Sequence, residues 1–265
     1  MAEMLQFDFM QRALLAALLV GAVAPMVGIF VVQRGLSLIG DALGHVALAG
    51  VAVGVVMQAQ PVWTALAVAV LAAVVIEALR ARGGTASDVA LALMFHTGIA
   101  LGVVLISTSP GTANLENYLF GAITTTSSAD LRLFVVLGVV VAVATTLLRP
   151  RLFAVAQDEV YSRSQGLPVT ALNMLLSALV AVTIVMSMRV VGLLLISALM
   201  IVPIATSQLL TRSFAAAWWV AMVLGALSGV GGVVVSYTYD LPSGGTIVLL
   251  AVAVYALAVL GTWVA

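Results

Sequence analysis

Residues 10–33 read MQRALLAALLVGAVAPMVGIFVVQ, an apolar run whose one charged side chain is Arg12. A helix of about 20 mainly apolar residues is enough to cross the hydrocarbon core of a bilayer. This run reaches that length. No small-residue cleavage site with a mature domain follows it, so we interpret it as a retained membrane helix and not as a signal peptide.

Similar runs fill the rest of the chain, and we expect spans at 36–58, 61–79, 88–108, 130–148, 170–187, 190–210, 214–236 and 246–264. The count is 8 or 9, because only a short polar stretch separates the runs 36–58 and 61–79. The sequence therefore predicts an all-α, polytopic transmembrane bundle in a single domain over 1–265. The longer connector 109–129 is expected to hold a short interfacial helix, with Tyr118 and Phe120 at headgroup depth.

Composition excludes the other broad classes. Of 265 residues, 64% are hydrophobic and 8% are charged, whereas soluble domains carry about 25% charged residues. An ordinary soluble enzyme and a disordered chain are both excluded. The zero net charge gives no reason to expect a nucleic-acid partner, and membrane lipid is the expected surrounding. Because cysteine is absent, a soft metal would need His, carboxylate or Met ligands.

The arginines indicate how the connectors are sided. If successive connectors alternate sides, one side holds seven of the ten arginines: Arg34, Arg80, Arg82, Arg149, Arg151, Arg163 and Arg212. Cytoplasmic connectors of membrane proteins are enriched in Lys and Arg. We therefore expect the connectors 80–87, 149–169 and 211–213 in the cytoplasm, and Arg12, Arg132 and Arg189 on the other side.

The motif Gly40-Asp41-Ala42-Leu43-Gly44-His45 holds the strongest candidate ligands. Asp41 and His45 are four apart, so a helix presents both from one face. A carboxylate oxygen and an imidazole nitrogen suit a divalent ion such as Zn or Mn, and ionisable side chains in the membrane usually serve a pathway. An Asp–His bond that only holds two helices together is the alternative. His96 is a second candidate ligand or gate, although a histidine bonded to a Ser, a Thr or a backbone carbonyl is the more common case.

The connector 149–169, which we expect in the cytoplasm, carries a second motif. From Asp158 to Pro168 we expect a short polar helix that ends in a Gly-x-Pro turn and is suited to docking on a partner, unless it is only a solvated loop. Nearby, Glu77 is expected to pair with Arg80 one turn later. The chain has no phosphate-binding P-loop, so any ATP-driven motor would be on another chain.

With these segments in place, the chain resembles the zinc/manganese ABC-importer permease family over nearly its whole length. The resemblance rests on four motifs in order: Arg34-Gly-Leu-Ser-Leu-Ile-Gly-Asp41-Ala-Leu-Gly-His45, Gly166-Leu-Pro168, Val190-Val-Gly192 through Ile201-Val-Pro203-Ile-Ala-Thr206, and Tyr239-Asp-Leu-Pro-Ser-Gly-Gly-Thr246. Gly44 departs from the family pattern, in which the residue before the histidine is often small but somewhat larger than glycine.

The resemblance implies a type II ABC importer-like permease in the bacterial plasma membrane. It implies a homodimer on two cytoplasmic ATPase subunits, which use the ATP, and an extracytoplasmic metal-binding protein that delivers the ion. Asp41 and His45 would line the metal path at the dimer centre. The cytoplasmic coupling segment would span about 152–169, and its expected contact residues are Asp158, Glu159, Gly166, Leu167 and Pro168.

We expect no covalent chemistry and no permanently bound cofactor, with zinc ahead of manganese as the transported ion. A permease for metal chelates such as siderophores or cobalamin is the first alternative, although it would need a wider path. An ATP-independent channel or carrier is the second, but inverted repeats and buried acidic relays are not evident. An intramembrane enzyme would need a convergent nucleophile and base, which one Asp–His pair does not supply.

Overall fold

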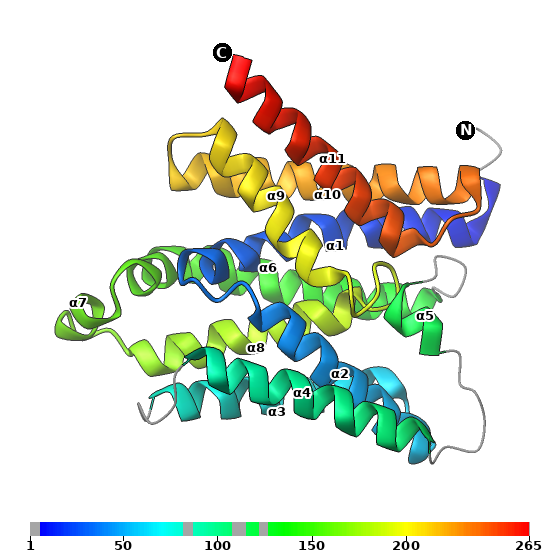
Figure 1. The fold of residues 1–265 in the computed structure, drawn as a ribbon, viewed down its shortest axis with the longest axis horizontal. Coiled ribbons are helices and arrows are strands. Elements are labelled where there is room, and N and C mark those ends of the chain that lie inside the picture. Colours follow the sequence, from blue (N-terminus) through cyan, green and yellow to red (C-terminus); the bar gives the residue numbers. More distant parts are fainter. Residues whose placement is uncertain (1–5, 82–86, 108–114, 122–126, 265) are drawn as a thin grey trace.

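The structure is a computed structural model, and it describes residues 6–81, 87–107, 115–121 and 127–264. Every regular element in these ranges is a helix (Figure 1). The helices are α1 (Asp8–Gln33), α2 (Ile39–Val56), α3 (Pro61–Ala81), α4 (Ser87–Ser107), α5 (Leu115–Leu119), α6 (Ser128–Gln157), α7 (Glu159–Ser164), α8 (Val169–Ser187), α9 (Ile196–Leu210), α10 (Phe214–Tyr239) and α11 (Ser243–Val264).

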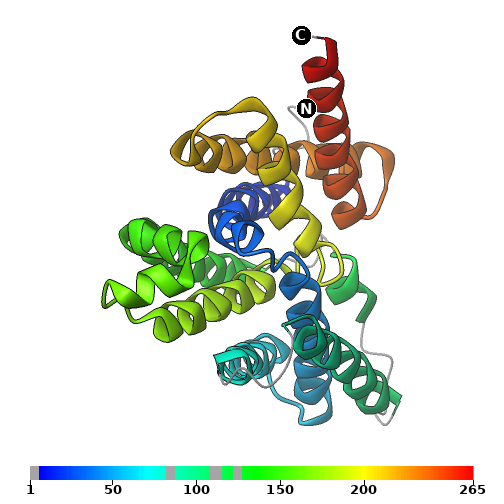
Figure 2. The ribbon, with the colours of Figure 1, turned by 60° about the vertical axis from the view of Figure 1, so that its left-hand side comes forward.

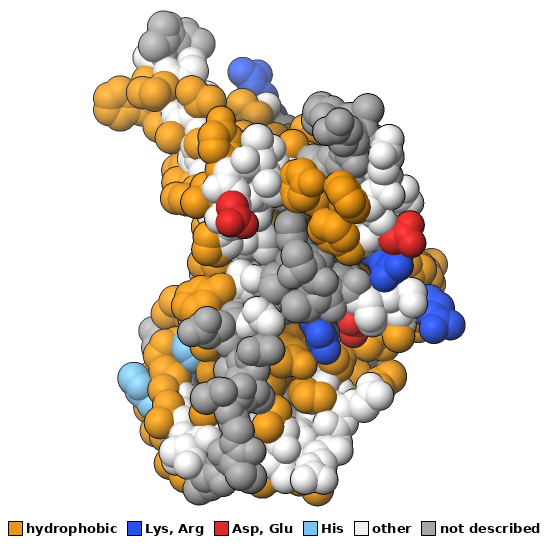
Figure 3. Space-filling model, turned by 90° about the vertical axis from the view of Figure 1, so that its right-hand side faces the viewer, with side chains coloured by type: hydrophobic (Ala, Val, Ile, Leu, Met, Phe, Trp, Pro, Cys, Tyr) orange, Lys and Arg blue, Asp and Glu red, His pale blue; other side chains and the backbone are white. Residues whose placement is uncertain are grey.

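Eight of these helices are long and apolar enough to cross a membrane, all except α5, α7 and α9. The all-α membrane bundle predicted from the sequence is thereby confirmed. Hydrophobic side chains spread over the face seen in Figure 3, and charged groups on it are few. Lipid offers no hydrogen bonds to an exposed backbone, and helices satisfy their backbone groups within the segment.

The helices form three groups in space (Figures 1 and 2). Helices α9, α10 and α11 lie on one side, α2, α3 and α4 lie on the other, and α1, α6 and α8 run between them. Helix α1 packs along α10, α2 packs against both α3 and α4, and α8 contacts α3, α6 and α2. Helix α8 therefore connects the group that carries Asp41 to the rest of the bundle.

The connectors gather at two ends of the bundle, with α7 at one and α5 at the other (Figure 1). At the α7 end, Arg34 contacts Glu159, and a cavity of about 330 Å³ brings Gln157 together with Arg212. At the α5 end, Arg189 lies near Tyr118 and Asp130. Both groupings agree with the sidedness that the arginines predict.

The expected span 190–210 is wrong at its start. Residues 188–195 form turns, and α9 begins only at Ile196. Gly192 has φ +90°, which a right-handed helix cannot contain. The N–H groups of Leu193 and Leu194 donate instead to the carbonyls of Tyr118 and Leu119 in α5. Irregular backbone at membrane depth is tolerated where protein buries it, and Val190, Val191 and Leu193 are buried here.

The expected span 130–148 is too short. Helix α6 continues through Pro150 to Gln157, because a proline removes one backbone donor without ending the apolar face. Leu152 and Val155, beyond the proline, are both buried. The short helix expected within 109–129 is confirmed as α5, while residues 108–114 and 122–126 of that connector lie outside the described part of the chain.

Glycines let the helices approach closely. Gly21 of α1 and Gly225 of α10 face each other, and a Cβ added to either would collide with the backbone of the other. Pro25 lacks the N–H that would bond the Gly21 carbonyl in a regular helix, and that carbonyl lies against Gly225. Helices in a membrane gain no hydrophobic drive against lipid, so this close van der Waals contact supplies much of their association.

We expect Gly225→Leu to destabilise the protein, because the new side chain would force α1 and α10 apart. Overpacking of this kind costs about 1–3 kcal/mol. The check is a thermal melt in detergent, with Gly261→Leu as the control, since a Cβ at Gly261 meets no atom within 4 Å. Equal melting temperatures for the two variants would contradict the role given to this contact.

Candidate functional site

Asp41 lies in the first turn of α2, where a carboxylate is favoured by the positive end of the helix dipole. The hydroxyl of Ser197, at the start of α9, donates to Asp41 Oδ1 over 2.5 Å. The late start of α9 is what places Ser197 there. Sequence reasoning missed this residue, because 156 positions separate it from Asp41.

His45 follows one turn later on the same helix, as the spacing predicts. Its ring packs edge-on against Phe95 of α4, with ring centroids 4.4 Å apart. Its Nδ1 is buried and has no hydrogen-bond partner among the described residues. An imidazole nitrogen in this position remains available to an ion or to a group from another chain.

His96 lies on α4 next to Phe95, and its ring stands at 90° to the phenyl ring at 5.3 Å. A cavity of about 330 Å³ is lined by Asp41 and His96 together with Leu38, Ala42, Leu91, Ala92 and Phe95. The structure thus brings Asp41 and His96 to one cavity, whereas His45 is not among the residues that line it. Within the described residues, no three His, Asp or Glu side chains are close enough to hold a metal ion.

Helix α2, which carries Asp41 and His45, packs through its glycines against the start of α9 and the turn before it. A Cβ at Gly44 would lie 2.8 Å from the carbonyl oxygen of Leu193, and a Cβ at Gly40 would lie 3.1 Å from Cβ of Ser197. The absence of a side chain at Gly44 is therefore what admits the 188–195 segment. The departure from the family pattern has a local packing reason.

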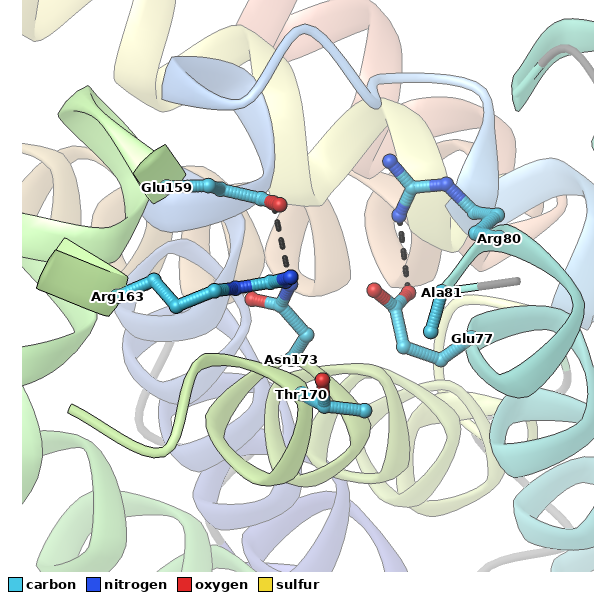
Figure 4. Close-up of a pocket in the computed structure, with 7 residues that line it drawn as sticks. All are labelled: Glu77, Arg80, Ala81, Glu159, Arg163, Thr170 and Asn173. Carbon is cyan, nitrogen blue, oxygen red and sulfur yellow. Dashed lines mark hydrogen bonds and ion pairs between the residues drawn. The ribbon is translucent and has the colours of Figure 1, made fainter. Parts of the chain in front are cut away.

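Charged side chains of α3 and α7 line one pocket together with neutral residues of α8 (Figure 4). Glu77 of α3 is 3% exposed and accepts hydrogen bonds from Arg80 (2.9 Å), Arg34 (3.4 Å) and Ser177 (3.4 Å). The Glu77–Arg80 pair expected from the sequence is present. Arg34 was not foreseen as a partner, because it is 43 residues away.

Residues 158–168 form the short helix and the turn that the sequence predicts. Asp158 is the N-cap of α7, and its carboxylate accepts from the N–H of Tyr161 at 2.9 Å. Gly166 has φ +80° and turns the chain toward Pro168, which precedes α8. Glu159 points back into the bundle, where it accepts from Asn173 at 3.1 Å (Figure 4).

Sequence reasoning missed the outward face of α7. Val160 and Tyr161 have mainly apolar side chains, and they are 82% and 62% exposed. The signal was present, since this apolar pair is flanked by charged and polar residues, but a six-residue helix has too few turns to show a periodicity. Both residues are therefore accessible to a partner on α7.

We expect Glu77→Gln to lower the stability strongly, because it leaves the buried guanidinium group of Arg34 and the partly buried one of Arg80 with less compensating charge. Breaking a buried ion pair costs about 3–5 kcal/mol. The control is Asp8→Asn, whose carboxylate is 84% exposed and pairs with Arg12 at 3.8 Å. Thermal melts should separate the two variants, and similar losses would show that the Glu77 cluster is not stabilising.

Comparison with known proteins gives the same picture along the whole chain. The model of the ABC 3 transport family matches residues 6–262. The manganese transport system membrane protein MntC of Halalkalibacterium halodurans is 33% identical over 97% of this chain and 88% of its own length. The manganese import system permease protein ScaB of Streptococcus parasanguinis is 34% identical over 92% and 87%.

Among solved structures, PsaBC from Streptococcus pneumoniae in complex with Fab is similar to this chain. It superposes with a TM-score of 0.87 at 30% identity, covering 97% of this chain and 94% of that one. The match extends over the helices that carry Asp41, His45 and the α7 segment. Together with the eight membrane-length helices, these findings confirm the resemblance drawn from the four motifs: the chain belongs to the ABC 3 transport family.

Proposed function

We propose that Asp41 and His45 line the path along which this permease moves its ion. The chain is a multi-pass plasma-membrane permease of an ATP-binding cassette metal importer. The observation that carries the site is the arrangement on α2, where the Asp41 carboxylate accepts from Ser197 and the imidazole Nδ1 one turn further on has no partner among the described residues. Such groups are costly inside a membrane and mark ion pathways.

The cargo is a divalent transition metal. Oxygen and nitrogen ligands serve both Mn and Zn, and selection between them depends on geometry and supply. The sequence alone put zinc first, but MntC and ScaB carry manganese in their names, so we propose manganese as the first ion to test. A site for transport must accept the ion and release it again, which an incomplete ligand set favours.

A homodimer completes the site. The described part of one chain holds no group of three His, Asp or Glu side chains that could bind a metal. A two-fold axis beside α2 would bring a second Asp41 and His45 to the same path, because a symmetric interface places the same surface on both subunits. No cofactor is needed beyond the transported ion and the ATP used by the partner.

The ATPase subunits dock on α7. The exposed pair Val160 and Tyr161 supplies an apolar tip, and aromatic side chains dominate the binding energy at protein interfaces. The shape of the segment is set by Asp158, Gly166, Leu167 and Pro168. Glu159 connects it to the bundle through its ion pair with Arg34. An extracytoplasmic binding protein would deliver the ion at the α5 end.

Two alternatives remain as outcomes of the transport assay. A permease for metal chelates would take up siderophore or cobalamin complexes in place of the free ion. A carrier without ATPase subunits would show uptake without ATP. The named manganese relatives favour neither of them.

We expect Asp41→Ala and His45→Ala to reduce ATP-driven Mn²⁺ uptake at least about tenfold. Removing a residue that only hydrogen-bonds a metal ligand already lowers metal affinity or activity by about this factor. The assay uses liposomes that contain the permease with its ATPase and its binding protein. Asp240→Asn is the control, because Asp240 caps the far end of α10 in a left-handed conformation that Asn also adopts. Normal uptake by both alanine variants would make Asp41 and His45 packing residues.

We expect Tyr161→Ala to weaken binding of the ATPase by about 2 kcal/mol without unfolding the permease, as loss of an exposed aromatic anchor does. Binding can be measured by titration of the ATPase onto the permease in detergent. Tyr239→Ala is matched to it, because Tyr239 is 70% exposed at the opposite end of the bundle. Equal affinities for the two variants would exclude the tip of α7 from the docking surface.

A further inference from the structure

Arg34 lies at the point where α1 ends, and its guanidinium group is held by two carboxylates from different parts of the fold. Its Nη2 is 2.7 Å from Glu159 of α7 and 3.4 Å from Glu77 of α3. The side chain of Arg34 is only 4% exposed. A single buried cation thus joins the proposed docking segment to the interior of the bundle.

The two carboxylates differ in how firmly they are held. Glu77 is 4% exposed at its side chain and is also bonded by Arg80 and Ser177, so it is fixed within the bundle. The side chain of Glu159 is 43% exposed and belongs to a six-residue helix with connectors on both sides. Glu159 can therefore move with a partner that grips α7, whereas Glu77 cannot.

Arg34 is also joined directly to the helix that carries Asp41. Residues 34–38 are the whole connection between α1 and α2, and Asp41 lies in the first turn of α2. Leu36 in this connection is 5% exposed, and its N–H bonds the carbonyl of Val31. Because this connection is so short, a displacement of Arg34 is expected to move the start of α2 as well.

We propose that Arg34 is the residue through which movement of α7 reaches the Asp41 helix. If Glu159 moved and Arg34 did not, the buried guanidinium group would lose one of its two carboxylate partners, and an uncompensated buried charge is strongly unfavourable. Arg34 therefore follows Glu159 and shifts the 34–38 connection against the fixed Glu77. This inference rests on the proposed function and adds to it the physical link between the ATPase and the ion path. Arg34 acts as a positioning residue, since it touches no part of the ion site.

The test is a double-variant cycle on the full complex in liposomes, with Arg34→Gln, Glu159→Gln and both together. The quantity measured is the number of Mn²⁺ ions imported per ATP hydrolysed. Each single change should lower this ratio at least about fivefold, the size of a typical coupling between sites. The double variant should be no worse than either single one, because both changes remove the same link.

Asn173→Ala is the matched control. It removes a neutral donor from the same Glu159 oxygen but leaves the ion pair with Arg34, so its ratio should stay near that of the wild type. Thermal melts of the same complexes separate coupling from stability. A purely structural role would lower the melting temperature and leave the ratio of the assembled complex unchanged.

Three results would overturn the inference: an unchanged ratio in both single variants, losses that multiply in the double variant, or an equal loss in Asn173→Ala. If Arg34→Gln does not assemble, the half-exposed Glu159→Gln and its control decide the question by themselves. If the wild-type complex shows no ATP-driven uptake at all, the proposed function fails, and the coupling role fails with it. Uptake in the wild type with unaltered ratios removes the coupling role alone.

Discussion

The constraint on which the structure depends is that polar groups inside this bundle rely on partners within the protein, and the buried His45 Nδ1 stands out because it lacks one among the described residues. Lipid satisfies neither a backbone carbonyl nor a charge. The apolar runs therefore fold as helices, whose backbone groups bond internally. Where the chain leaves the helix, in 188–195, the N–H groups of Leu193 and Leu194 bond carbonyls of α5 instead. The buried guanidinium group of Arg34 is likewise paired within the protein, with the carboxylates of Glu77 and Glu159.

This irregular segment also builds the candidate ion site. The turn at Gly192 delays the start of α9, which brings Ser197 to Asp41 and sets the Leu193 carbonyl against Gly44. Broken helices in transport proteins persist where they line a cavity or are buried by neighbours. The α5 end and the Asp41 helix are thus connected through the backbone of residues 188–195, while the α7 end contacts Arg34, which precedes α2, through the carboxylate of Glu159. The two ends of the molecule reach α2 by different kinds of interaction.

Much of the fold could be predicted, because membrane thickness imposes a length that apolar runs reveal directly. The spacing of Asp41 and His45, the short helix after Asp158 and the Gly166 turn are local features, and the structure has them where the sequence indicates. The two wrong boundaries also have local causes. Hydropathy continues across Gly192 although the helix does not, and it falls at Arg149 although α6 continues beyond Pro150.

By itself, the sequence determined that the chain is a helical membrane protein, which residues could serve an ion, and which connectors share a side. Each of these follows from composition or from spacing along one helix. Only the tertiary structure decided that Ser197 bonds Asp41, that His96 and not His45 shares the cavity of Asp41, and that Arg34 joins Glu159 to Glu77. These contacts join residues 43 to 156 positions apart, and packing between helices, which no local pattern encodes, brings them together.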